Sequence, residues 1–272
     1  MIAPALLAHP VGRAFDSLAE NYDEVFTCSL IGRAQRDAVW GAARAAFTPG
    51  SRILEINCGT GEDALFLARQ GVIVFACDAS EQMIAVAKQR HTTEAPGSRI
   101  RFRVLAIEQL EALKKAGGFD GVFSNFSGLN CVSDLHQVAR ALLQLVKPRG
   151  RLLLCFSTRC CCWETLWFLA RAQLAKAFRR WSGKTTAQLG GFPVEVRYPT
   201  IPEICRAFSP GFRLRSCMGI GITVPPSYLE PWARRHPKAI RRMEMVDAMI
   251  CTWRGFRAIG DHVLLCFERC SA

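Results

Sequence analysis

The stretch LEINCGTGED, residues 54–63, decides how this chain folds. It follows Ser51-Arg52-Ile53 and precedes an apolar run over 64–68, which predicts a strand, a Gly-rich turn and a helix in succession. Gly59 and Gly61 allow a tight turn in which the backbone closely approaches a ligand. Asn57 stands where the usual nucleotide-binding pattern has its first glycine. Because Asn tolerates left-handed backbone better than most residues, we expect Asn57 to preserve the turn.

The alternation of strand and helix continues along the chain. Strands are predicted over 53–57, 72–77, 100–105, 121–125, 151–156, 212–218 and 262–268. Helices are predicted within 12–47 and over 61–70, 80–90, 132–146 and 202–208, with a short one ending at Lys115. This order predicts an α/β fold, with a parallel sheet covered by helices on both faces. A ligand would bind beyond the carboxyl ends of the strands, near the first one.

Composition narrows the class of protein. Half of the 272 residues are hydrophobic, but no run approaches the ~18 apolar residues of a membrane span. The first fifteen residues have a short apolar run with no basic flank, so no secretory signal is expected. The thirteen cysteines include the triplet Cys160-Cys161-Cys162 but no C-x-x-C pair. We expect reduced thiols in a cytoplasmic protein and no metal; the alternative is a soft-metal or arsenic site that uses Cys155 and the triplet.

Charge divides the chain into two unlike parts. Residues 1–150 carry 16 Lys and Arg against 15 Asp and Glu, whereas residues 151–272 carry 19 against 8. The second part should therefore meet an acidic partner or an anionic surface.

Two acidic residues indicate which kind of ligand the turn binds. Glu55 lies inside the strand that feeds the turn, where a buried carboxylate suits a loop amide or a positively charged ligand better than a pyrophosphate. Asp78 ends the next strand, where an acid can accept hydrogen bonds from both ribose hydroxyls. These features favour a nucleoside with a cationic group over a dinucleotide.

Three segments together resemble a family: LEINCGTGED, VFACDASEQMIAVAK and FDGVFSNFSGLNCV. They are similar to the signatures of class I S-adenosylmethionine-dependent methyltransferases (EC 2.1.1.-), small-molecule branch, near the quinone C-methyltransferases and methyltransferase types 11 and 25. The resemblance is good over 12–156, moderate at GDHVLLCFER and poor over 157–258. It implies a Rossmann-like, seven-stranded, mostly parallel sheet whose last strand is antiparallel and inserted between the fifth and sixth. It also implies a helical cap after the fifth strand.

The resemblance implies one domain over 1–272, with N-terminal helices (12–50), a cofactor-binding half (51–156), a substrate and cap region (157–258) and a final strand (259–270). It implies S-adenosyl-L-methionine as cofactor. The cofactor-binding residues that it implies are Glu55, Asn57, Cys58, Gly59, Thr60, Gly61, Asp78, Ala79, Met83, Ala106, Ile107, Asn125 and Phe126. Tyr22 would lie over the cofactor, Glu108 near the adenine amine, and Arg33 or Arg36 near the methionine carboxylate.

The acceptor must be bound by the second part of the chain. His262 begins the last strand and is a candidate base or polar substrate contact, with a hydrogen-bonded structural histidine as the alternative. His136 is expected on a helix face. Residues 163–181, WETLWFLARAQLAKAFRRW, predict one amphipathic helix with a Trp- and Leu-rich face and a basic side. It would be a packed cap helix, a lid over an apolar or anionic substrate, or a helix at a lipid surface.

We therefore expect a methyltransferase acting on a small or lipid-like acceptor. A nucleic-acid methyltransferase is the first alternative, suggested by the basic half. It is disfavoured because Ser124-Asn125-Phe126-Ser127 lacks the prolines of the base N-methylation turn. The others are a non-catalytic binding protein with this fold and a nicotinamide dehydrogenase. The sequence fixes neither the acceptor atom nor the oligomeric state.

Overall fold

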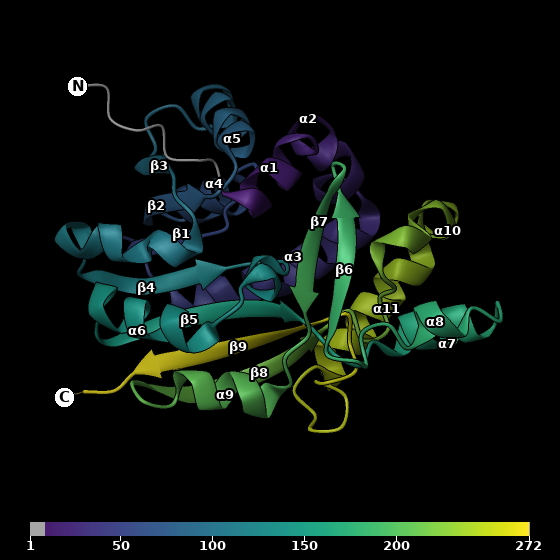
Figure 1. The fold of residues 1–272 in the computed structure, drawn as a ribbon. Coiled ribbons are helices and arrows are strands. Elements are labelled where there is room, and N and C mark those ends of the chain that lie inside the picture. Colours follow the sequence, from purple (N-terminus) through teal and green to yellow (C-terminus); the bar gives the residue numbers. More distant parts are fainter. Residues whose placement is uncertain (1–8, 272) are drawn as a thin grey trace.

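The computed structural model describes residues 9–271 and contains the expected seven-stranded sheet (Figure 1). Its strand order is β3-β2-β1-β4-β5-β9-β8, and β9 runs antiparallel to both of its neighbours while the other strands are parallel. The strands are β1 (Arg52–Ile56), β2 (Ile73–Asp78), β3 (Ile100–Val104), β4 (Phe119–Ser124), β5 (Val146–Ser157), β8 (Phe212–Ile220) and β9 (His262–Arg269). The predicted antiparallel last strand, inserted between the fifth and sixth, is confirmed.

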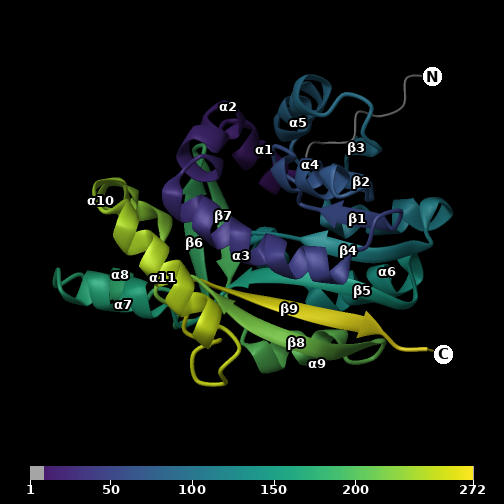
Figure 2. The same cartoon turned by 180° about the vertical axis from the view of Figure 1, so that it is seen from behind.

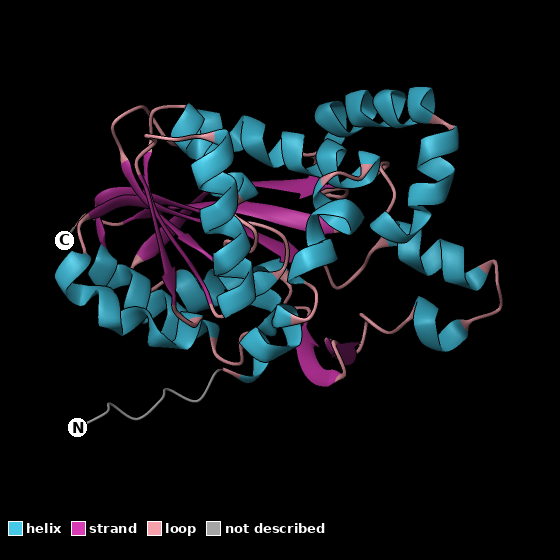
Figure 3. Cartoon of the chain, turned by 90° about the horizontal axis from the view of Figure 1, so that it is seen from above, coloured by secondary structure: helices cyan, strands magenta, loops and turns pink. Residues whose placement is uncertain are grey.

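Helices cover both faces of this sheet (Figures 2 and 3). Successive side chains of a strand point to opposite faces, so β1 contributes Ile53 to one core cluster and Leu54 and Ile56 to the other. One face packs on α3 (Leu30–Ala46), α4 (Glu62–Arg69) and α5 (Glu81–Glu94). The other packs on the 3₁₀ helix η2 (Ile107–Ala116), α6 (Leu135–Leu145) and α9 (Ile201–Phe208). Burial on both faces explains the nearly continuous apolar runs of the strands.

Three short helices precede α3 in the N-terminal region. They are α1 (Pro10–Asp16), α2 (Ala19–Tyr22) and the π-helix η1 (Asp23–Thr27), which ends before Ser29 caps α3. A single turn of π-helix is rare and frequently occurs at functional sites. The expectation about the first fifteen residues rests partly on residues 1–8, which lie outside the described part.

The cap after β5 differs from the prediction. The single helix expected over 163–181 is wrong: α7 (Cys162–Leu169) ends where Ala172 adopts a left-handed φ of 56°, and α8 (Leu174–Ala177) follows. Residues 190–191 form the turn of a hairpin between β6 (Lys184–Leu189) and β7 (Phe192–Arg197). The stretch 222–258 contains η4 (Ser227–Leu229), α10 (Glu230–Arg235) and α11 (Pro237–Ile250). The cap is therefore mixed, with helices and a two-stranded hairpin.

The cap has a small core of its own against α3. Ile31 and Ala34 of α3 pack with Val224, Leu229 and Ala233, and Trp163 and Trp167 lie against this cluster. Glu230 accepts hydrogen bonds from the backbone N–H groups of Leu30 and Ile31, which fixes α10 at the start of α3. Among residues 9–271, no helix has the length and apolar character needed to cross a bilayer.

Candidate active site

The turn after β1 is built from left-handed backbone. Asn57, Gly59 and Gly61 have φ values of 57°, 52° and 78°. This conformation explains why glycine is the usual residue and why Asn, which tolerates it, occupies the first position. A side chain on Gly61 would lie 2.9 Å from the Cβ of Ala87, whereas Gly59 faces open space. Gly59 therefore leaves room for a ligand above the turn.

Asp78 joins this turn to the end of β2. Its carboxylate accepts hydrogen bonds from the backbone N–H groups of Gly59 and Ser80, both at 2.9 Å. Burial raises the pKa of Asp78, and the bonds from the backbone amides oppose that rise. Ser80 in turn caps α5 by accepting from Met83 N–H. The acid thus fixes the turn and faces the space above it.

A cavity of about 420 Å³ lies over the turn, at the carboxyl ends of the parallel strands. Eight of the sequence-predicted site residues line it: Tyr22, Asn57, Gly59, Asp78, Ala79, Met83, Phe126 and His262. Seven others are not part of its lining: Glu55, Cys58, Thr60, Gly61, Ala106, Ile107 and Asn125. Among the remaining candidates Arg36 lines the cavity, Arg33 and His136 are exposed on helices, and Glu108 pairs with His9 at 3.3 Å.

Residues behind the cavity lining support it through an ion pair and a hydrogen bond. Asp63 pairs with Arg36 at 2.8 Å and accepts from Asn125 Nδ2 at 3.1 Å, and the guanidinium of Arg36 lies 4.9 Å from the centre of the Phe126 ring. Glu55 is fully buried nearby, and burial raises its pKa well above the ordinary value. Burial thus disfavours the charged form of the Glu55 carboxyl group.

Tyr22 is held over the turn by a second set of contacts. Thr60 Oγ1 donates to Asp23 Oδ1 at 2.7 Å, and Arg90 pairs with the same Asp23 carboxylate. Asp23 begins the π-helix that directly follows Tyr22. Thr60 thus positions this segment from below, while Tyr22 itself lines the cavity.

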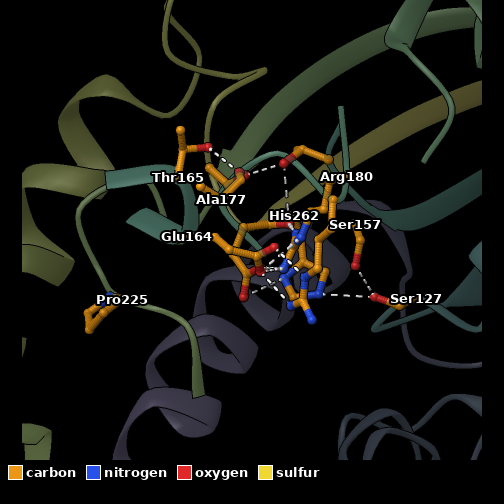
Figure 4. A network of polar contacts seen from close by, with 12 residues as sticks. Ser127, Ser157, Glu164, Thr165, Ala177, Arg180, Pro225 and His262 are labelled. Carbon is orange, nitrogen blue, oxygen red and sulfur yellow. Dashed lines mark hydrogen bonds and ion pairs between the residues drawn. The ribbon is translucent and has the colours of Figure 1, made fainter. Parts of the chain in front are cut away.

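The loop after β4 brings His262 into the cavity. Phe126 and Ser127 both have positive φ, at 44° and 63°, a strained backbone that clusters at functional sites. His262 Nε2 lies 3.1 Å from Ser127 Oγ, which is 2.5 Å from Ser157 Oγ (Figure 4). The Nδ1 atom lies 3.6 Å from Asp261 Oδ2. Burial lowers the pKa of His262 although Asp261 opposes the change, so the imidazole is neutral at pH 7.

An ion network around the buried Glu164 closes the far end of the cavity, and the sequence did not reveal it. Glu164 receives two hydrogen bonds from Arg179, at 2.6 and 2.8 Å, and one from Arg180 Nε at 3.1 Å. Arg180 also pairs with Asp261 at 2.9 Å (Figure 4). The one signal in the sequence was that Glu164 is the only acid between residues 158 and 194. Two cations and two anions balance one another here.

The cysteines do not form a metal site in the part of the chain that the structure describes. All thirteen lie within it and are free, and no group of three or more His, Cys, Asp or Glu side chains there could hold an ion. Burial raises the pKa of Cys155 and that of Cys161 to about 12, so both remain thiols.

Part of this chain is similar in sequence to known proteins. Residues 53–150 match a family described as a methyltransferase domain. The demethylmenaquinone methyltransferase of Streptomyces griseus subsp. griseus is 31% identical over 154 residues, 54% of this chain and 60% of that protein. The enzyme of the same name from Thermobifida fusca is 32% identical over 148 residues, 53% of this chain and 60% of that protein. The chain thus spans less than two thirds of the curated relatives that it matches.

Solved structures are similar over almost the whole chain. The CcbJ methyltransferase of Streptomyces caelestis has a TM-score of 0.61 at 17% identity, covering 95% of this chain and 98% of that one. A structure titled as the [4+2]-cyclase SpnF has the same TM-score and identity and covers 96% of each chain. These likenesses show the fold, and the second shows that the fold alone does not determine the reaction.

Proposed function

We propose that this chain, a member of the class I S-adenosylmethionine-dependent methyltransferase family, transfers a methyl group from S-adenosylmethionine to a small or lipid-like acceptor. The observation that carries the proposal is that Asp78, the left-handed turn and the neutral His262 all face one cavity. The family match ends at residue 150, so the acceptor must be argued from the residues that follow.

The residues around the turn suit this cofactor. Asp78 offers carboxylate oxygens to the ribose, Gly59 has open space above it, and Ala79 and Met83 offer apolar contacts to the adenine. Two buried donors of residues that line this cavity, Arg36 Nε and Asn57 Nδ2, have no hydrogen-bond partner within residues 9–271. We assign Arg36 to the methionine carboxylate because a guanidinium donates well to a carboxylate. The remaining predicted residues, among them Glu55, Thr60 and Asn125, would act by fixing the turn and Arg36.

When bound, the cofactor supplies an electrophilic methyl group on a sulfonium. The chain then has to align the acceptor and exclude water. Phe126 and Tyr22 line the cavity and supply apolar walls, and His262 can accept a proton from an acceptor that ionises as it reacts. Asp261 lies on the Nδ1 side of the ring, where it stabilises the protonated imidazole that would result. Ser127 and Ser157 extend the polar contacts from Nε2.

The acceptor that fits best is neutral. The sequence suggested an anion, but Arg179 and Arg180 are compensated by Glu164 and Asp261, so their charges are already satisfied. The cavity also has apolar residues from the hairpin and the cap: Ala187, Leu189, Val196 and Tyr228. A neutral ring that carries a hydroxyl or carbonyl group for His262 and an apolar substituent for these residues would fit the cavity. A quinol-type molecule has these features. The thirteen free thiols support a cytoplasmic setting.

The test is a methyl-transfer screen with labelled S-adenosylmethionine over fractionated cell extract. Label in the lipid or small-molecule fraction is expected, and a quinol panel would follow. Label in RNA alone would overturn the acceptor class. Cofactor binding without any transfer would instead favour a binding protein with this fold. His262→Gln, compared with the exposed His136→Gln, should reduce the transfer while the control does not.

A further inference from the structure

The cap ends in a projecting pair of short helices whose apolar side chains are exposed. Figure 1 shows α7 and α8 extending beyond the sheet, at the opposite end from β3. Leu166 and Leu174 are 62% and 61% exposed, and Leu169, Phe178 and Trp181 are also exposed. We call these five residues the cap tip. Burial in the core of the cap explains the inward residues Trp163 and Trp167, but the cap tip has no partner among residues 9–271.

The charges beside the cap tip have one sign. Arg171 and Lys176 are exposed and form no ion pair within residues 9–271, and the only acid between residues 158 and 194, Glu164, is buried and pairs with Arg179 and Arg180. The guanidinium carbon of Arg171 lies 3.3 Å from the centre of the Trp167 ring, and Lys176 Nζ lies 5.7 Å from the centre of the Phe168 ring. Apolar side chains interleaved with unopposed cations are complementary to a surface that is anionic outside and apolar beneath.

The cap tip is also continuous with the cavity. Phe168 of α7 lies 5.6 Å, ring centre to ring centre, from Tyr228, which lines the cavity and is partly exposed. Phe26 also lines the cavity and is 41% exposed. An apolar path therefore leads from the cap tip past Tyr228 to the site where the acceptor would bind.

We propose that the cap tip docks on an anionic lipid surface, from which a lipid-like acceptor enters the cavity past Tyr228. The second part of this proposal rests on the proposed function, whereas the docking itself does not. A lipid surface fits better than a nucleic acid because leucines, which do not bind phosphates, form the most exposed part. It fits better than a second copy of the chain because, in a dimer formed through the cap tip, the cations beside it on one copy would repel those on the other.

The experiment measures sedimentation of the full chain with phosphatidylcholine vesicles that contain or lack phosphatidylserine. We expect binding to the anionic vesicles that weakens as salt screens the charges. Leu166→Ser/Leu174→Ser should lose about tenfold or more in affinity because the apolar contact is removed. Arg171→Gln/Lys176→Gln should lose about tenfold because each cation near an anionic surface contributes favourably. The matched controls lie at the other end of the molecule: Val104→Ser for the apolar pair and Lys88→Gln/Lys115→Gln for the charges.

Three results would overturn the docking: no sedimentation of the native chain, equal binding to vesicles without phosphatidylserine, or losses in the controls as large as in the cap-tip variants. A concentration-dependent dimer that disappears in Leu166→Ser/Leu174→Ser, without vesicle binding, would assign the cap tip to a second copy. Calorimetry of cofactor binding by every variant checks that each is folded. It also separates the two proposals, since transfer to an acceptor in detergent without vesicle binding would sink the docking alone.

Discussion

At the scale of single residues, Asn57 shows how backbone conformation governs a substitution. Its φ of 57° is a conformation that glycine adopts freely, and its side chain packs so closely on Gly128 that a methyl group there would lie 2.5 Å from Asn57 Cβ. We predict that Asn57→Gly keeps cofactor affinity and changes the free energy of unfolding by no more than about 1 kcal/mol. Calorimetry and denaturant unfolding measure the two quantities. Asn57→Val cannot adopt this φ easily, so it should lose both cofactor affinity and folding stability. A tenfold loss of affinity in Asn57→Gly would instead mean that the side-chain amide of Asn57 contacts the ligand.

Asp78 is predicted to be the most sensitive residue of the cofactor end. Asp78→Ala removes the acceptor for the Gly59 and Ser80 amides and the proposed acceptor for the ribose hydroxyls. We expect cofactor binding to weaken by about 1–3 kcal/mol in calorimetry. Asp78→Asn keeps one acceptor oxygen and should lose less, while the exposed Glu111→Gln is the neutral control. An unchanged affinity in the alanine variant would contradict the ribose assignment.

His262 gives the reaction and the fold a shared pH dependence. Its pKa in the folded chain lies below the ordinary value of 6.5 because burial disfavours the charged ring. If it accepts the proton, kcat/KM of the native chain falls on the acid side of pH 6.5, and His262→Gln loses that limb together with about 10²–10⁴-fold of the rate. A transfer rate of His262→Gln within a few-fold of the native one would leave this histidine with a structural role.

The lowered pKa of His262 also determines how the stability of the folded chain changes with pH. Below pH 6.5 the unfolded chain binds a proton at this histidine before the folded chain does. The contribution of His262 is therefore fully present above about pH 6.5 and is lost as the pH falls through the folded pKa. His262→Gln should flatten the stability profile in that window, as measured by denaturant unfolding at several pH values. A structural histidine would change this profile alone, whereas a catalytic base changes both profiles.

At the scale of elements, prediction succeeded where the signal was local. The strands and helices up to residue 157 follow from apolar runs, Gly turns and caps within a few residues, as at Ser80. The cap was mispredicted because Ala172 breaks the helix without a Gly or Pro to mark the break. The ion network was missed because Arg180 and Asp261 are 81 residues apart and meet only in the fold. The hairpin did have a signal, since Gly190-Gly191 separates two runs of strand-forming residues.

The hairpin yields a prediction with an internal control. Gly190 and Gly191 both have positive φ, as a tight two-residue hairpin turn requires. A Cβ on Gly190 would also lie 1.9 Å from Ser17 Oγ and 2.8 Å from the carbonyl oxygen of Ala14, both at the end of α1, whereas nothing lies near Gly191. Gly190→Ala should therefore destabilise more than Gly191→Ala, where only the backbone cost of about 1–2 kcal/mol applies. Equal effects in thermal unfolding would mean that the hairpin does not rest on α1. Because Leu189 and Val196 line the cavity, Gly190→Ala should also raise KM for the acceptor.

At the scale of the whole molecule, the cavity joins the part that matches the family to the part that does not. Its lining combines the turn after β1 and the end of β2, which lie within the match, with α1, the hairpin, the cap and the start of β9, which lie outside it. A ligand bound there contacts both parts and should stabilise the folded chain as one unit. With the cofactor at 100 times its Kd, the gain is about 2.7 kcal/mol. For a chain of this size each kcal/mol raises Tm by about 2–4 °C, so we predict a rise of about 5–11 °C.

The same measurement ranks the contacts of the cofactor. S-adenosylhomocysteine keeps the ribose and the amino-acid carboxylate, so it should raise Tm about as much as the cofactor, and adenosine alone should raise it less. At the same cofactor concentration, a tenfold loss of affinity in Asp78→Ala removes about 1.4 kcal/mol, or about 3–6 °C of the rise. Arg36→Met should reduce the gap between S-adenosylhomocysteine and adenosine, because that gap reports the carboxylate. The absence of any rise with saturating cofactor would leave the fold without its proposed ligand, and the cavity would then belong to a binding protein that has lost the reaction.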